Sequence, residues 1–151
     1  MEVNRKTFRI ILVALLIISG VFAAWSWMRP YEWSADPGAR VQIAGCFVER
    51  DHSNYWVNLE LKVPSGVTHD LEQQVTLITA AGERIEPADT TLEGDEAQAV
   101  RRIWLKFWLE KEQLEGPLDL EINEGQLSVR SREGLPKLRK DGNRYFVTHR
   151  W

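Results

Sequence analysis

The sequence predicts a mainly β protein, an immunoglobulin-like β-sandwich of about seven to eight antiparallel strands, preceded by one N-terminal transmembrane helix. Three observations support this fold class. Residues 10–28 carry no charge. Residues 41–151 contain short segments in which apolar and polar side chains alternate. Turn-forming residues separate these segments about every 8 to 12 positions, a spacing typical of sandwiches.

The uncharged segment 10–28 has the length and composition of a membrane-spanning helix. At about 1.5 Å per residue its 19 residues make a helix of about 28 Å, close to the roughly 30 Å hydrocarbon layer of a bilayer. Trp25 and Trp27 end the segment, and Tyr31 and Trp33 follow it. Amphipathic aromatic side chains are typical of the headgroup layer, so we expect these four residues at the membrane interface.

The orientation of the segment follows from the basic residues beside it. The flank 1–9 holds three basic residues and one acidic residue, a balance of +2, whereas Arg29 and more distantly Arg40 follow the segment. Because basic flanks stay in the cytoplasm, we expect a cytoplasmic N-terminus and an extracytoplasmic C-terminal domain, which is periplasmic in a Gram-negative bacterium.

A cleaved secretory signal is the alternative interpretation of this segment. Ala23 and Ala24 supply the small residues that a signal peptidase needs. The apolar run is long for a signal and leads into aromatic residues, which favours a retained anchor. Both interpretations export the domain.

Residues 29–40 read as a short connector because Pro37 and Gly38 favour a turn. In the first strand after it, we expect Val41, Ile43, Gly45 and Phe47 to share one face. Period-two alternation and turn residues predict the following strands in the domain 41–151: 41–49, 55–63, 75–80, 83–86, 101–110, 118–122, 126–132 and 144–151.

The stretch 95–114 fits two structures. As a helix it begins at Asp95 and ends before Gly116, but it leaves Leu105 and Leu109 away from its apolar side. As a strand over 101–110 it places four aliphatic or phenyl groups on one face. The second pattern, with strands on both sides in sequence, favours a strand.

The same alternation places three tryptophans on polar strand faces. Trp56 alternates with Asn58 and Glu60, while Trp104 and Trp108 flank Lys106. Clustered exposed tryptophans usually mark an interface. We therefore predict a binding surface for a partner or ligand at Trp56, Trp104, Lys106 and Trp108. The alternative is that other parts of the chain, such as Tyr31, Trp33 or the C-terminal strand, cover these side chains.

Charge is unevenly distributed along the chain. Residues 10–129 carry 9 basic and 19 acidic side chains, a balance of −10, and residues 130–151 carry 7 basic and 2 acidic ones, a balance of +5. An acidic body argues against nucleic acid as a partner, because binding there depends on neutralising phosphates. We expect the basic end to form a final hairpin against the acidic domain; contact with anionic lipid or an anionic polymer is the alternative.

The sequence carries no pattern of a catalytic, cofactor or metal site. His52, His69 and His149 do not share a zinc-type spacing, and Cys46 is the single cysteine. We therefore expect no cofactor and a non-catalytic interaction module that docks a membrane or envelope protein. A module that binds a glycan through the tryptophans is the second hypothesis, and an uncharacterised hydrolase is the third, because carboxylate pairs are defined only in space.

Overall fold

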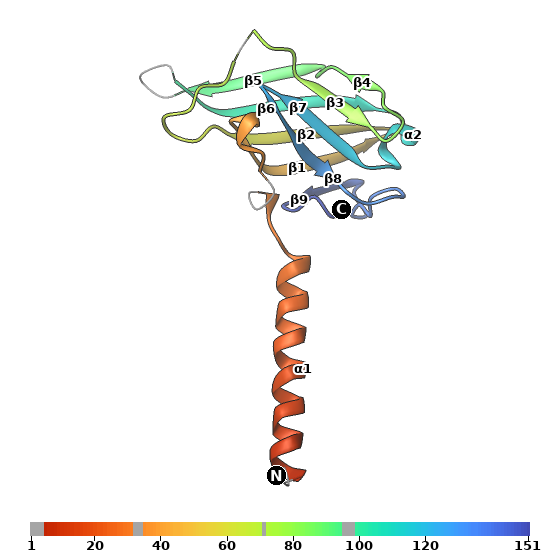
Figure 1. Ribbon diagram of the computed structural model, residues 1–151. Helices are drawn as coiled ribbons and strands as arrows, with labels where there is room; N and C mark the ends of the chain where they lie inside the picture. The colour runs from red at the N-terminus through yellow and green to blue at the C-terminus, as the bar shows by residue number, and fades with distance from the viewer. Residues whose placement is uncertain (1–4, 32–34, 71, 95–98) are drawn as a thin grey trace.

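The computed structural model describes residues 5–31, 35–70, 72–94 and 99–151. Helix α1 (Arg5–Trp27) stands apart from a mainly β domain, and none of its residues is buried (Figure 1). Its 23 residues make a helix of about 34 Å, long and apolar enough to cross a membrane. The helix begins earlier than the predicted residue 10, because the basic residues before the apolar run continue the same helical turns.

The domain consists of two antiparallel sheets that share one hydrophobic core. Sheet A has the strand order β5-β6-β2-β1-β9, and sheet B has the order β4-β3-β7-β8. The strands are β1 (Gln42–Asp51), β2 (Asn54–Lys62), β3 (Thr76–Thr79), β4 (Arg84–Ile85), β5 (Asp89–Gly94), β6 (Val100–Leu109), β7 (Leu118–Ile122), β8 (Gly125–Arg130) and β9 (Asn143–Phe146). The short helix α2 (Lys111–Leu114) joins β6 to β7.

The core lies between the inner faces of the two sheets. Alternate residues of β2 and β6 point into it, and Val57, Leu59 and Phe107 are fully buried. Strand β6 pairs with β5 on one side and with β2 on the other. The prediction of a strand at 101–110 is therefore confirmed. A helix there would leave the inner-facing residues Leu105 and Leu109 outside the core.

The prediction that Val41, Ile43, Gly45 and Phe47 share one face is wrong beyond Ile43. The register between β1 and β2 shifts between Ile43 and Gly45, so Ala44 is one residue too many for regular pairing. A one-residue bulge moves every later side chain to the opposite face. As a result Cys46 and Val48 are buried, and Phe47 lies on the outer face of sheet A.

Two strand predictions also need correction. Strand β5 (Asp89–Gly94) was not predicted, because its residues DTTLEG are all exposed and show no apolar alternation. Predicted strand 144–151 ends at Phe146, since the following residues leave the sheet. Trp151 instead packs in the core, where its ring stacks on Phe146 at 4.8 Å between ring centroids.

The segment predicted as a connector is partly built into the domain. Its 3-10 turn η2 (Pro37–Ala39) is capped by Asp36, whose side chain accepts a hydrogen bond from Gly38 N. Ala39 is fully buried. A Cβ atom on Gly125 would lie only 2.1 Å from Ala39 N, so the start of β8 needs glycine to lie against this turn.

Candidate functional site

The outer face of sheet A carries the strongest candidate site. Side chains at every second position of its strands point away from the core, and the aromatic ones among them remain partly exposed. We call this set the outer aromatic face. It consists of Phe47, Trp56, Trp104, Trp108 and Tyr145.

Trp56 and Trp108 form a pair of packed rings at one end of this face. They are direct cross-strand partners in β2 and β6. Their ring centroids are 4.4 Å apart with the planes tilted by 59°. Lys106 Nζ lies 4.3 Å from the centroid of the Trp56 ring, a cation–π contact. Trp56, Lys106 and Trp108, which were predicted as binding residues, therefore lie together. The Lys106 ammonium group contacts the Trp56 ring.

Trp104 lies on the same face of β6, separated from Trp108 by Lys106. Its cross-strand partners are Thr91 in β5 and Glu60 in β2. Within the described part of the chain, no aromatic ring or cation stacks on Trp104. Its neighbours across the sheet offer a hydroxyl and a carboxylate beside this partly exposed ring.

Tyr145 extends the face across β1. Its ring lies over Gly45, where a Cβ atom would be 2.0 Å from the tyrosine oxygen. The hydroxyl donates a hydrogen bond to Glu60 Oε2 at 3.3 Å, and Arg102 Nη1 lies 3.6 Å from Glu60 Oε1. Burial and the neighbouring Glu60 carboxylate raise the pKa of Tyr145. A carboxylate is thus held between a phenol and a guanidinium inside an aromatic surface.

Sequence reasoning missed two members of this face. Phe47 was expected to share a face with Val41 and Ile43, because the bulge at Ala44 leaves no trace in the apolar pattern. Tyr145 was placed in the last strand without a partner, because β9 pairs with β1, about 100 residues away in the sequence. The glycine at 45 was the one available signal, since glycine inside a strand often marks close approach of another group.

The four residues predicted for the membrane interface differ in where the structure places them. Trp25 and Trp27 are exposed on α1, and each has a guanidinium near its ring: Arg29 at 4.8 Å and Arg132 at 5.0 Å. Trp33 lies outside the described residues. The prediction for Tyr31 is wrong, because its side chain is only 3% exposed and lies in the domain core.

Tyr31 belongs to a buried network at the C-terminal end of the domain. Its hydroxyl donates to Val129 O at 2.6 Å and accepts from Trp151 Nε1 at 2.6 Å. The Arg130 side chain donates to Trp151 O at 2.7 Å and to Gly116 O at 3.1 Å. Burial lowers the pKa of Arg130. These bonds satisfy buried polar groups, so the network stabilises the fold.

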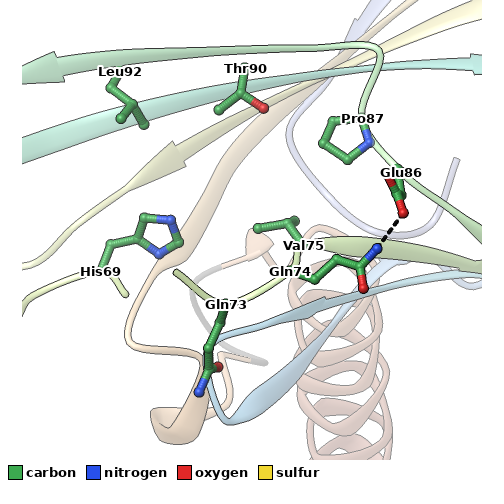
Figure 2. A pocket seen from close by; sticks show the side chains of 8 residues that line it. All are labelled: His69, Gln73, Gln74, Val75, Glu86, Pro87, Thr90 and Leu92. Carbon is green, nitrogen blue, oxygen red and sulfur yellow. Dashed lines mark hydrogen bonds between the residues drawn. The ribbon is translucent and has the colours of Figure 1, made fainter. Parts of the chain in front are cut away.

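A hollow of about 430 Å³ lies where the open edges of the two sheets meet. Figure 2 shows its lining, with His69 on one side and Glu86 on the other, where Gln74 donates a hydrogen bond to the Glu86 carboxylate. His69 Nδ1 lies 3.1 Å from Asn123 Oδ1, and burial lowers the pKa of this imidazole. His69 and Glu86 do not contact each other, so the hollow presents no acid–base pair.

The other chemically reactive side chains are isolated. His52 contacts Asp51 at 2.7 Å, but both side chains are solvated. Cys46 is fully buried, and this burial raises the pKa of its thiol. Among residues 5–31, 35–70, 72–94 and 99–151, no three His, Cys, Asp or Glu side chains form a group that could hold a metal ion.

Comparison with known proteins adds no relative to this picture. No family model, no curated protein and no solved structure matches the chain. The case for the outer aromatic face therefore rests on the structure alone.

Proposed function

We propose that the chain is a single-pass membrane protein whose N-terminal flank is cytoplasmic and whose β domain is displayed on the extracytoplasmic side. The length and apolarity of α1 support the anchor. The basic residues before it support the orientation. Because the helix ends four residues before the buried Tyr31, the domain is held close to the bilayer.

The domain acts as a non-catalytic interaction module, and its outer aromatic face docks another membrane or envelope protein. The observation that carries this proposal is the cluster of five partly exposed aromatic side chains on one face of sheet A. Exposed aromatic surface is costly in a monomer and usually marks an interface. Tryptophan, tyrosine and arginine are also the residues that contribute most to binding at interfaces.

The arrangement of charges supports a protein partner. Trp56 and Trp108 pack together with the Lys106 ammonium over the Trp56 ring. The Glu60 carboxylate lies beside Arg102 further along the same face. Interfaces commonly combine such an aromatic centre with a polar rim. The short link between α1 and the domain favours a partner that is embedded in the membrane or lies near it.

A glycan-binding module is the second candidate, and Trp104 favours it. This residue is partly exposed, carries no stacked ring or cation among the described residues, and lies beside Thr91 and Glu60, which offer a hydroxyl and a carboxylate for sugar hydroxyl groups. By contrast, the ring of Trp56 already contacts Lys106 and Trp108. A sugar would therefore stack at Trp104.

We further infer an immunoglobulin-like arrangement of the sandwich. Two antiparallel sheets of five and four strands support it, as does a chain that passes repeatedly between the two sheets.

Affinity capture of the full chain from solubilised membranes tests the docking proposal. We expect the wild type to retain a reproducible membrane protein that Trp56→Ser/Trp104→Ser/Trp108→Ser loses. The matched control, Asp119→Ala/Ser128→Ala, changes the outer face of sheet B and should retain the partner. Failure of the wild type to capture a reproducible partner, or capture of the same protein by the folded triple variant, would contradict the proposal.

Titration with envelope polysaccharide fragments tests the second candidate. A saturable change in tryptophan fluorescence that disappears in Trp104→Ala supports a glycan site. No saturation with the wild type rejects it.

Protease added to spheroplasts tests the membrane topology. We expect digestion of the domain and survival of a fragment that contains the flank and α1. A protected domain would contradict the proposed orientation, and a mature chain without residues 1–24 would indicate a cleaved signal in place of an anchor.

A further inference from the structure

The C-terminal part of the domain presents a basic surface toward the membrane helix. Figure 1 shows β9 and the C-terminal residues on the side of the domain that α1 approaches. Tyr31 N donates a hydrogen bond to Val147 O at 3.3 Å, and the Arg132 guanidinium lies 5.0 Å from the Trp27 ring. We call the basic residues that line one hollow there the membrane-facing basic surface: Arg132, Lys137, Arg144 and Arg150.

Basic side chains outnumber acidic ones at this end of the chain. Residues 131–151 hold six basic and two acidic side chains, a balance of +4. Within the described ranges, no salt bridge joins any of the six to a carboxylate. Arg144 Nη1 instead donates to Lys137 O at 3.1 Å. The basic end lies against the domain through the pairing of β9 with β1 and not as the expected final hairpin, and no ion pair among the described residues joins it to the acidic body.

The surface contains a hollow with both charged and apolar walls. Its volume is about 420 Å³, and Arg132, Lys137, Arg144 and Arg150 contribute to its lining together with one carboxylate, that of Glu133. Leu135 and Val147 line it too, and they are 38% and 55% exposed. Basic groups beside exposed apolar side chains are typical of surfaces that lie on a lipid headgroup layer.

We propose that the membrane-facing basic surface binds the headgroup phosphates of anionic phospholipids in the leaflet from which the domain emerges. The place of this surface in the molecule favours lipid over other polyanions. Helix α1 ends next to the surface and so holds it within reach of the headgroups. Arginine and lysine bind phosphate through charge-assisted hydrogen bonds. Such binding would fix the orientation of the domain on the bilayer and direct its outer aromatic face toward a neighbouring protein.

The inference rests on the membrane anchor of the proposed function, but not on the outer aromatic face or on the side of the membrane. The test therefore begins with extraction of membranes at alkaline pH. A chain that resists extraction is anchored whatever its lipid preference. A chain that is extracted would refute the anchor, and this inference with it.

The direct measurement uses the full chain reconstituted in phosphatidylcholine bilayers with spin-labelled phosphatidylglycerol or spin-labelled phosphatidylcholine as the probe. We expect the motionally restricted fraction to be larger for phosphatidylglycerol. Lys137→Gln/Arg144→Gln should lower the relative association by about fivefold for each charge removed. Arg84→Gln/Lys111→Gln removes the same charge from β4 and α2, away from α1, and should leave the preference unchanged.

Two additional measurements complete the test. High salt, on the order of 1 M, should abolish the preference of the wild type, which keeps the test decisive if the double variant does not fold. Inorganic phosphate and a soluble polyphosphate should fail to compete at low concentration. Equal association of both lipids with the wild type, equal loss in the two double variants, or displacement by a soluble polyanion would overturn the proposal.

Discussion

The two faces of sheet A are built from the same strands but differ in chemistry. On β6, the inner face holds Ile103, Leu105 and Phe107, which are 0–1% exposed, whereas Trp104 and Trp108 on the outer face remain partly exposed. Burial of the inner side chains stabilises the fold. The outer side chains contribute less to folding, so their large aromatic rings are available for binding.

Phe107→Ala should have the largest effect on stability. The phenyl group is fully buried between the sheets, so its removal leaves a cavity and lowers the free energy of unfolding by about 3–5 kcal/mol. Chemical denaturation measured by circular dichroism would show it. A loss no greater than that of Trp104→Ala would contradict the division between the two faces.

Trp151→Ala tests whether a tryptophan at the C-terminal end belongs to the core. It removes the stack on Phe146 and the Nε1 bonds to the Tyr31 hydroxyl and to Val129 O at 3.0 Å. We expect a loss of about 3 kcal/mol. Trp151→Phe keeps most of the stacking and should lose about 1–2 kcal/mol through the missing hydrogen bonds. If neither variant lowered the free energy of unfolding, Trp151 would not be a core residue.

Gly45→Val tests the contact between the bulge and the outer aromatic face. Valine favours strands, but its Cβ would lie 2.0 Å from the Tyr145 oxygen, so we expect a loss of about 1–3 kcal/mol. In a Tyr145→Ala background the same substitution should cost much less, and a double-mutant cycle gives the coupling energy. Additive effects would show that the tyrosine does not lie over Gly45.

Trp104→Ala should have the smallest effect on stability, below about 1 kcal/mol, because substitutions outside the core are usually mild. Its effect should instead appear in binding. Thermal unfolding and partner capture from the same preparation would separate the two. A large drop in melting temperature would place Trp104 among the residues that hold the fold.

Alternation in the sequence was sufficient to predict β2, β6 and the side of the sheet on which Trp56, Trp104 and Trp108 lie. Side chains of a half-buried strand must alternate, so the pattern records which face is buried. The polar partners Asn58, Glu60 and Lys106 identify the outer face. This part of the candidate site needed no knowledge of the fold.

The remaining features depend on contacts between distant parts of the chain. The bulge at Ala44 reverses the faces of β1, and a single small residue gives no sign of it. Strand β5 is polar because it is an exposed edge, so it lacks an apolar face to detect. Tyr31 resembles a headgroup residue, but its hydroxyl finds Val129 O, which is 98 positions away. No local pattern predicts such a partner.

Site-specific photocrosslinking tests the central claim that the outer aromatic face is a binding surface. A benzophenone amino acid replaces Trp104 in the full chain, and in a control it replaces Ser128 on the outer face of sheet B. After irradiation of living cells, we predict one discrete protein adduct from position 104 and none from position 128. No protein adduct at position 104, or the same adduct from both positions, would contradict the account.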